Sequence, residues 1–441
     1  MAGIEHHTVI IVGGGPAGLA LAVVLGGSHP HFRESQMFSE RYEPLAEHLR
    51  NVKGTLLGLD FRELVKAGVA PVDLFRLLHH PRQIFEDEAQ IALDFPEVEP
   101  LDYLLISREA VGGVWNNVPE NMLTLSPGQW MELAFYPLAQ HIREQSVGLD
   151  ANDLIIKADL LNYYHHIPSR FGQEERIRTD ESVISIEPHD VGFHITTQDV
   201  RGEMTHRYTC KYLVYAVGQR CVLRRLDVSG EELPFVASAY DKPESFPGER
   251  VLVVGGGRSA DWAATELHDA GRQVHYITRV SRDRHWRLIN DSRYGLPYYA
   301  RIAEIIEGRS SRMEILYEAH ISEIKANDSV GLVTVSHNGD ERTVEVDHVV
   351  KEIGGIADYS TFSGFPPLTL VDQYDNYRFQ LKQVPTHPHN YEALDVPNLY
   401  MGGYLAAGIG LVVIAMHGTT YAIAGDILQK EGHLVPVGFG V

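Results

Sequence analysis

The feature that most constrains the fold is a strand, glycine loop and helix pattern that occurs twice in the chain. Residues 8–12 form an apolar, β-rich run that ends in GGGPAG and passes into the apolar helical stretch 19–25. Residues 250–254 are followed in the same way by GGGRSA and the helical stretch DWAATELHDAG. This order of elements is typical of the dinucleotide-binding unit of doubly wound folds. The chain is therefore predicted to be an α/β protein with two nested Rossmann-like dinucleotide-binding domains.

Other apolar runs place one unit inside the other. Strands are expected at 103–106, 183–186, 212–217, 273–278 and 344–353, with a hairpin around 193–208. The apolar segment 399–428 then leads back toward the first unit. These positions predict one domain from residues 1–240 and 350–441 and an inserted second domain from residues 241–349. Residues 28–100 are polar and interrupted by prolines, which favours either an inserted, lid-like helical segment or a solvated surface insertion.

In the first loop, Gly13, Gly15 and Gly18 fit the G-x-G-x-x-G pattern. The first glycine allows a tight turn, the second lets the backbone approach a pyrophosphate, and the third lets helix and strand pack closely. Pro16 and Ala17 open the helix, whose free N–H groups and positive dipole end face the phosphate oxygens. The loop therefore predicts a bound dinucleotide, since a mononucleotide has no pyrophosphate.

The second loop contains Gly255, Gly257 and, in the last position, Ala260, which still permits close packing. Arg258 and Ser259 follow the second glycine and are placed to reach phosphates. About 20 residues further on, where an NAD site has an acid for the ribose hydroxyl, the chain has Arg279, and Arg282 follows. A guanidinium there suits a 2′-phosphate, so NADPH is predicted. The alternative is that these two arginines form surface ion pairs.

Charge and hydropathy narrow the range of partners. The chain has 38 basic and 59 acidic residues, and a formal charge of −21 repels nucleic acid and anionic membranes. The apolar stretch 405–416 contains glycines and is much shorter than the ~20 residues that span a bilayer. A small-molecule substrate is therefore expected, with no nucleic-acid or membrane partner. The sequence leaves both a monomer and a homo-oligomer open.

The cysteines and histidines limit the classes of reaction and of metal site that the chain can carry. Cys210 and Cys221 are the only two cysteines and form no CxxC or CxxxxC dithiol, so free thiols are expected and flavoprotein disulfide-reductase chemistry is excluded. None of the 23 histidines lies in a pattern such as HExxH, so no metal site is expected. The N-terminus lacks the charged start of a signal peptide, which predicts a cytoplasmic protein.

A resemblance to a known family rests on the segment REAVGGVWNNVPENMLTLSPGQWMEL at 108–133. This segment resembles the one that follows the second FAD strand in the oxidative stress-induced growth inhibitor family, which is similar to class B flavin monooxygenases and N-hydroxylases. Further matches are YAVG at 215–218, GGGRSA at the second loop and NLYMGG at 398–403. The histidine that typical flavin monooxygenases have ahead of the second loop is absent from SFPGERVLVVGGG.

The resemblance implies FAD at the first loop, NADPH at the second loop and chemistry with O2. It assigns to FAD the residues of the first loop together with Glu109 (for the ribose), Gly113, Val114, Trp115, Gly218, Gly402 and Gly403. Asn121, Ser126 and Gln129 follow the GG-x-W turn, which borders the flavin ring in related enzymes. They are candidate donors to the oxygenated flavin, or else they cap turns and helices.

The function expected from these features is an NADPH-dependent monooxygenase that transfers oxygen from a flavin hydroperoxide to a nucleophilic heteroatom, as in N-hydroxylation. Asn290, Arg293 and Tyr294 lie in a segment that mixes aromatic and polar residues, so they either face the substrate or pack a domain interface. Two alternatives stay open. One is an NADPH oxidase or flavin reductase that releases peroxide, and the other is a redox-sensing interaction protein with little turnover.

Overall fold

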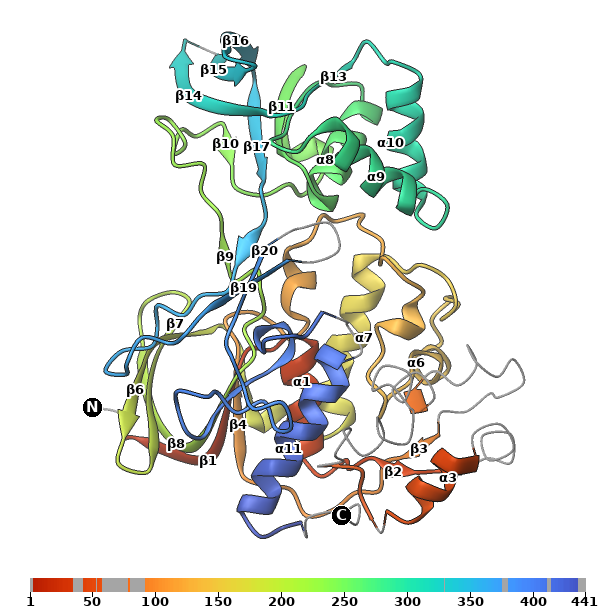
Figure 1. Ribbon diagram of the computed structural model, residues 1–441, viewed down its shortest axis with the longest axis vertical. Coiled ribbons are helices and arrows are strands. Elements are labelled where there is room, and N and C mark those ends of the chain that lie inside the picture. The colour runs from red at the N-terminus through yellow and green to blue at the C-terminus, as the bar shows by residue number, and fades with distance from the viewer. Residues whose placement is uncertain are drawn as a thin grey trace.

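The first glycine loop lies in the lower lobe of the molecule as drawn in Figure 1, at one edge of a seven-stranded sheet. The computed structural model describes residues 3–34, 43–52, 54–57, 78–79, 92–328, 330–374, 380–410 and 414–434. The sheet has the order β5-β4-β1-β8-β7-β6, and β21 also pairs with β8. Its strands are β1 (Glu5–Val12), β4 (Tyr103–Ile106), β5 (Ile177–Arg178), β6 (Glu181–His189), β7 (Gly192–Asp199), β8 (Thr205–Tyr215) and β21 (Leu399–Met401).

Strand β1 occupies the middle of this sheet because its second half is apolar on both faces. Residues Val9 to Val12 are buried and pair in parallel with β4 on one side and with β8 on the other. Helix α1 (Pro16–Leu25) follows at once, and α11 (Thr419–Lys430) lies beside it in Figure 1. The strands predicted at 103–106, 183–186 and 212–217 and the hairpin at 193–208 are confirmed.

The second glycine loop lies in the upper lobe, in a five-stranded parallel sheet of order β10-β17-β11-β12-β13. Its strands are β10 (Val236–Ala237), β11 (Arg250–Gly255), β12 (Gln273–Ile277), β13 (Met313–Leu316) and β17 (His348–Glu352). The lobe also contains helices α8 (Arg258–Asp269), α9 (Arg282–Ser292) and α10 (Pro297–Glu307). Strand β10 precedes residue 241 and β17 passes residue 349, so this sheet extends beyond the predicted segment at both ends.

The single strand predicted at 344–353 is wrong. Its first residues end β16 (Asp340–Val346), which forms an antiparallel three-stranded sheet with β14 (Ala319–Asn327) and β15 (Val330–His337). Its last residues form β17 in the other sheet. Asp347 separates the two strands, because its carboxylate accepts hydrogen bonds from the N–H groups of Glu249 and Arg250, both at 2.8 Å.

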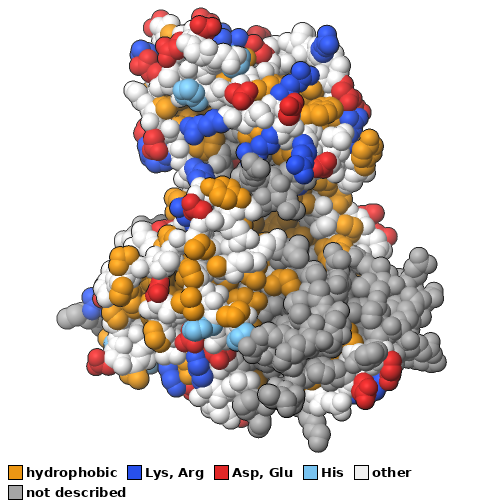
Figure 2. Space-filling model, in the orientation of Figure 1, with side chains coloured by type: hydrophobic (Ala, Val, Ile, Leu, Met, Phe, Trp, Pro, Cys, Tyr) orange, Lys and Arg blue, Asp and Glu red, His pale blue; other side chains and the backbone are white. Residues whose placement is uncertain are grey.

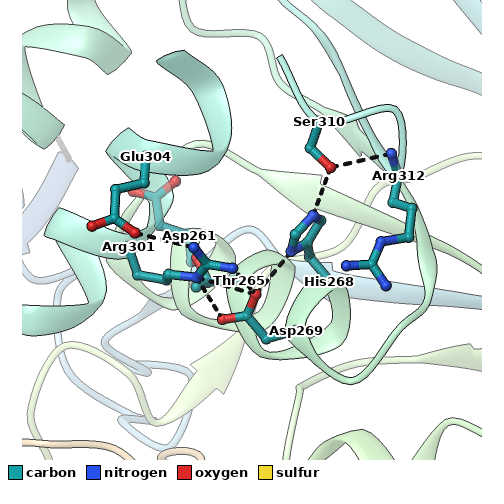
Figure 3. A network of polar contacts seen from close by, with 8 residues as sticks. All are labelled: Asp261, Thr265, His268, Asp269, Arg301, Glu304, Ser310 and Arg312. Carbon is teal, nitrogen blue, oxygen red and sulfur yellow. Dashed lines mark hydrogen bonds and ion pairs between the residues drawn. The ribbon is translucent and has the colours of Figure 1, made fainter. Parts of the chain in front are cut away.

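A side-chain network holds the far end of α8 in place (Figure 3). Arg301 of α10 pairs with Asp269 at 2.8 Å and with Glu304 at 3.0 Å. His268 contacts Asp269 through Nδ1 at 2.9 Å and the Ser310 hydroxyl through Nε2 at 2.8 Å. Because α8 starts at the second glycine loop, this network fixes the direction in which the start of the helix points.

The chain crosses between the lobes through two short strands, β9 (Val222–Leu223) and β18 (Gly355–Ile356), which pair antiparallel. The molecule narrows at this level, as Figure 2 shows. One apolar core nevertheless spans the lobes, since Val118 and Met122 of the first lobe pack with Tyr240, Phe246 and Trp262 of the second. The second unit is thus inserted into the first, which confirms the predicted α/β class with two Rossmann-like units.

Most of the predicted lid lies outside the described residues. Its described parts include β2 (His31–Phe32), α3 (Glu43–Arg50) and β3 (Leu93–Asp94). The remaining elements are α6 (Leu138–Gln145), α7 (Lys157–Arg170), β19 (Val371–Tyr374), β20 (Gln380–Gln383), the 3-10 helices η2 (Gly113–Asn117), η3 (Gly128–Trp130), η4 (Glu174–Arg176), η5 (Pro243–Ser245) and η6 (Gly403–Leu405), and the π-helix η7 (Ile414–Gly418). In the part of the chain with described coordinates, no helix combines the length and the apolar character needed to cross a membrane.

Candidate functional site

Four loops meet at the carboxyl ends of β1, β4, β8 and β21, which parallel pairing places at one edge of the first sheet. They are the first glycine loop (13–18) and the turns at 112–115, 215–218 and 402–403. Backbone hydrogen bonds of 2.8–2.9 Å run from the N–H groups of Gly13, Gly112, Ala216 and Gly402 to the carbonyls of Ile106, Gly14, Val12 and Tyr215, respectively. The structure therefore brings together the loops that the sequence assigned to FAD.

Glycine is required in the first loop because backbone packs directly on backbone. Gly13 has a φ of +116°, and a Cβ there would lie 2.5 Å from the carbonyl oxygen of Ala216. A Cβ on Gly18 would collide with the carbonyl oxygen of Gly13. Helix α1 thus approaches β1 as closely as the third glycine of the pattern predicts.

Gly15 is different, because the space beside it is open. Among the described residues, a Cβ on Gly15 would meet only the Cα of Gly113, at an ordinary 3.7 Å. Gly15 is also the N-cap of α1, with no side-chain cap and no acidic residue in the first turn of the helix. The free N–H groups of that turn are where a phosphate binds. The loop therefore fits the pyrophosphate of a dinucleotide.

The turn that follows β4 connects this loop to the second lobe. Glu109 accepts hydrogen bonds from Asn117 at 2.6 Å and from Arg108 at 3.0 Å. Val114 is 44% exposed. Trp115 is half-buried and packs against apolar cores of both lobes. Its indole therefore lies between the lobes that carry the two glycine loops.

The second loop is packed as tightly as the first. A Cβ on Gly255 would collide with the carbonyl oxygen of Glu352 and would lie 2.6 Å from the Cβ of Ala260. Gly257 is the N-cap of α8, again without a side-chain cap. The guanidinium of Arg258 lies 5.3 Å from the centre of the Tyr299 ring. The start of α8 therefore also presents free N–H groups.

Arg279 and Arg282 follow β12, the strand next to β11. Both are exposed, and neither forms a hydrogen bond or an ion pair with another described residue. The surface ion pairs considered as their alternative role are thus not formed within the described chain. On the face drawn in Figure 2, basic side chains gather on the upper lobe just above the narrowing.

The six candidate catalytic residues form two separate groups. The first group is Asn121, Ser126 and Gln129. Gln129 lies in η3, Ser126 precedes that helix, and Asn121 donates a hydrogen bond at 3.2 Å to Glu266 of the second lobe. The second group follows β12. Asn290 is exposed on α9, Arg293 pairs with Glu307 at 2.9 Å, and Tyr294 is 88% exposed. No hydrogen bond or ring contact between described residues joins the first group to the second.

Arg220 and Glu352 were not predicted from the sequence. Arg220 donates to Ser259 at 3.2 Å and to Glu352 at 2.9 Å, so it contacts the second loop from the first lobe. The available signal was position, since Arg220 is the second residue after the YAVG turn and Glu352 ends a strand beside the second loop. The cysteines are free as expected, and burial raises the pKa of the Cys221 thiol.

Comparison with known proteins gives the family. Residues 90–403 match the family described as pyridine nucleotide-disulphide oxidoreductase. Oxidative stress-induced growth inhibitor 1 of Mus musculus is 24% identical over 98% of this chain and 97% of its own length, which confirms the predicted resemblance. Bacillithiol disulfide reductase from Bacillus cereus has the same fold, with a TM-score of 0.63 and 20% identity over 97% of this chain and 100% of that chain.

An ornithine N-hydroxylase from Kutzneria sp. 744, in a structure with reduced FAD, NADP+ and L-ornithine, has a TM-score of 0.60 and 16% identity over 97% of this chain and 100% of that chain. The family match covers well over half of the sequence and reaches across both lobes. The chain therefore belongs to the pyridine nucleotide-disulphide oxidoreductase family.

Proposed function

We propose that the protein is a FAD- and NADPH-dependent monooxygenase that inserts one oxygen atom from O2 into a small substrate at a nucleophilic heteroatom, as in N-hydroxylation. The observation that carries this proposal is the pair of uncapped helix starts, α1 and α8, linked by one apolar segment at 113–123. The Kutzneria N-hydroxylase, which has this fold, binds the same pair of cofactors.

Each cofactor has its own loop. FAD is held at the first loop by residues 13–18 with Glu109, the 113–115 turn, Gly218 and the 402–403 turn. NADPH is held at the second loop by Gly255, Gly257, Arg258 and Ser259, with Arg279 and Arg282 on the 2′-phosphate. Bound FAD supplies the two-electron chemistry, because it accepts hydride from NADPH and reacts with O2.

The chain itself must exclude water and keep the two cofactors aligned. Trp115, Val118 and Met122 do this by packing against the second lobe. The hydrogen bond from Asn121 to Glu266 fixes the same segment at its edge, and Tyr240 donates to the other oxygen of Glu266 at 3.0 Å. The absence of a dithiol favours O2 over a disulfide as the electron acceptor, although the family name refers to disulfides.

The test is an assay of coupling. The purified protein is analysed for FAD, and NADPH consumption is then measured with amino acids, polyamines and thioethers. A true substrate is expected to accelerate NADPH consumption, to gain 16 mass units and to lower the ratio of peroxide to NADPH. A ratio near one with every compound would support an oxidase instead. No NADPH consumption under any condition would support a redox-sensing protein.

A further inference from the structure

The loop that follows β8 has two ends with different roles. At its start, Ala216 packs on Gly13 of the first glycine loop. Gln219 then fixes the loop within the first lobe, since its amide donates to the carbonyls of Lys382 at 2.6 Å and Tyr404 at 2.9 Å. The next residue, Arg220, points the other way. The backbone of this loop is therefore tied to the first lobe, while one cationic side chain leaves it for the second.

The side chain of Arg220 extends to the second glycine loop and is closely packed along its length. Its stem passes Gly355, where a Cβ would lie 2.8 Å from the Cγ of Arg220. Its guanidinium donates to the Glu352 carboxylate at 2.9 Å and to the Ser259 hydroxyl at 3.2 Å. Ser259 lies in the first turn of α8. The cation is thus held at the start of that helix by fixed neighbours.

Electrostatics make this position notable. The start of a helix carries a partial positive charge, which repels a cation. Glu352 offsets part of that repulsion. Its side chain is buried and also accepts a hydrogen bond from the Tyr240 N–H at 2.6 Å, and burial raises its pKa while Arg220 opposes that change. Glu352 holds one edge of the guanidinium, and the edge beside Ser259 stays next to the uncapped N–H groups. An anion bound there would interact favourably with both the guanidinium and the helix.

We propose that Arg220 binds the pyrophosphate of the nicotinamide cofactor from the first lobe, so that the cofactor is held by both lobes at once. This inference rests on the proposed function. The pyrophosphate is common to NADPH and NADH, whereas the 2′-phosphate belongs to NADPH alone. Arg220 therefore contributes to the binding of both cofactors equally, and Arg279 and Arg282 discriminate between them. This contact would couple cofactor binding in the second lobe to the loop that packs on the first glycine loop.

The test is equilibrium binding of NADP+ and NAD+ to the FAD-loaded protein by calorimetry. The main variant is Arg220→Gln/Glu352→Gln, which removes both charges and leaves no buried charge unpaired. We expect the Kd for NADP+ and for NAD+ to rise by the same factor, about 10- to 150-fold for a lost hydrogen bond to a charged group. The FAD content should stay at the wild-type level. Arg220→Lys keeps a cation beside Glu352 but loses the planar fork, so a smaller rise in both Kd values is expected.

A matched control is Lys242→Gln/Glu120→Gln. Lys242 and Glu120 also form an ion pair between the lobes, at 2.6 Å, and neither side chain forms a hydrogen bond or ion pair with the second loop. This control should bind both cofactors as the wild type does. Wild-type affinity in both Arg220 variants would overturn the inference and make Arg220 a structural link between lobes. A loss confined to NADP+ would overturn it too, because Arg220 would then contact the 2′-phosphate. A wild-type protein that binds neither nicotinamide nucleotide would overturn the proposed function itself.

Discussion

The two glycine loops share a sequence pattern but differ in the groups that surround them. The first is surrounded by backbone, since the turns at 112–113, 216 and 402–403 pack directly on it. The second is also packed against backbone, at the carbonyl of Glu352, but charged side chains lie beside it as well. Arg220 contacts Ser259 and Glu352, Arg258 lies over the Tyr299 ring, and two exposed arginines follow β12. Backbone packing sets the shape of a binding site, and side-chain charge sets its selectivity. We therefore expect the first loop to retain its dinucleotide and the second to exchange it.

The charge of the whole chain sharpens this difference. A protein with a net charge of −21 repels an anionic cofactor that must enter from solution. Local cations at the second loop offset that repulsion at the point where exchange takes place. A cofactor that stays bound at the first loop does not have to overcome this repulsion at every turnover. Under the proposed function, we expect the arginines at the second loop to offset this repulsion for a cofactor that is bound and released at every turnover.

The largest effect is expected where backbone packing is tested directly. Gly18→Ala places a methyl group on the carbonyl oxygen of Gly13 and should lower the free energy of unfolding by about 3 kcal/mol or more. The equivalent position of the second loop already has Ala260, and Ala260→Gly should cost only about 1 kcal/mol. Urea unfolding measures both. Gly148→Ala, in open space, is the control. Wild-type stability of Gly18→Ala would mean that close backbone packing at the first loop does not set it apart from the second.

A second variant separates binding from folding at the same loop. Gly15→Ala makes only an ordinary contact of 3.7 Å with Gly113, so the variant should fold normally. The methyl group nevertheless occupies the space that a pyrophosphate needs, and we expect flavin binding to weaken by about tenfold or more. Flavin content and the urea midpoint are measured together. Full flavin content in a stable variant would show that the loop is only a turn.

At the second loop the prediction concerns selectivity. Arg279→Ala should raise the KM for NADPH, and so lower kcat/KM, by about 10- to 150-fold, because a guanidinium donates two hydrogen bonds to a 2′-phosphate. Binding of NADH should stay nearly unchanged, and Arg279→Ala/Arg282→Ala should lose more. The ratio of kcat/KM for the two cofactors is the measurement. An unchanged ratio in both variants would place the phosphate contact elsewhere.

Local and non-local features differ in how far the sequence reveals them. The strand, glycine loop and helix order of both units follows from contiguous residues, so the sequence predicts the α/β class, the strand at 8–12 and the packing role of Gly18. The single strand expected at 344–353 is wrong because Asp347 interrupts this apolar run. Its carboxylate accepts hydrogen bonds at the start of another strand, so two strands form in place of one. Arg220 was missed for a related reason. Its role depends on the insertion of one lobe into the other, which brings residues 220, 259 and 352 together.

The last comparison is between a buried carboxylate in each lobe. Glu132 is 7% exposed in the first lobe and accepts a hydrogen bond from the Leu138 N–H at 2.8 Å, and burial raises its pKa from the ordinary 4.5 to about 8. Between these two values the folded protein binds more protons than the unfolded chain. The free energy of unfolding should therefore fall as the pH rises through this window, by up to about 1.4 kcal/mol per pH unit.

Glu132→Gln removes this titration, so its unfolding free energy should depend less steeply on pH than that of the wild type. The two proteins should be most alike near pH 4.5, and the variant should be relatively more stable near pH 8. The same substitution at Glu352 should flatten the profile less, because Arg220 already opposes the effect of burial there. Urea unfolding across this pH range tests both variants. Equal changes at the two sites would mean that the charged neighbours of the second loop do not set its electrostatics apart from those of the first lobe.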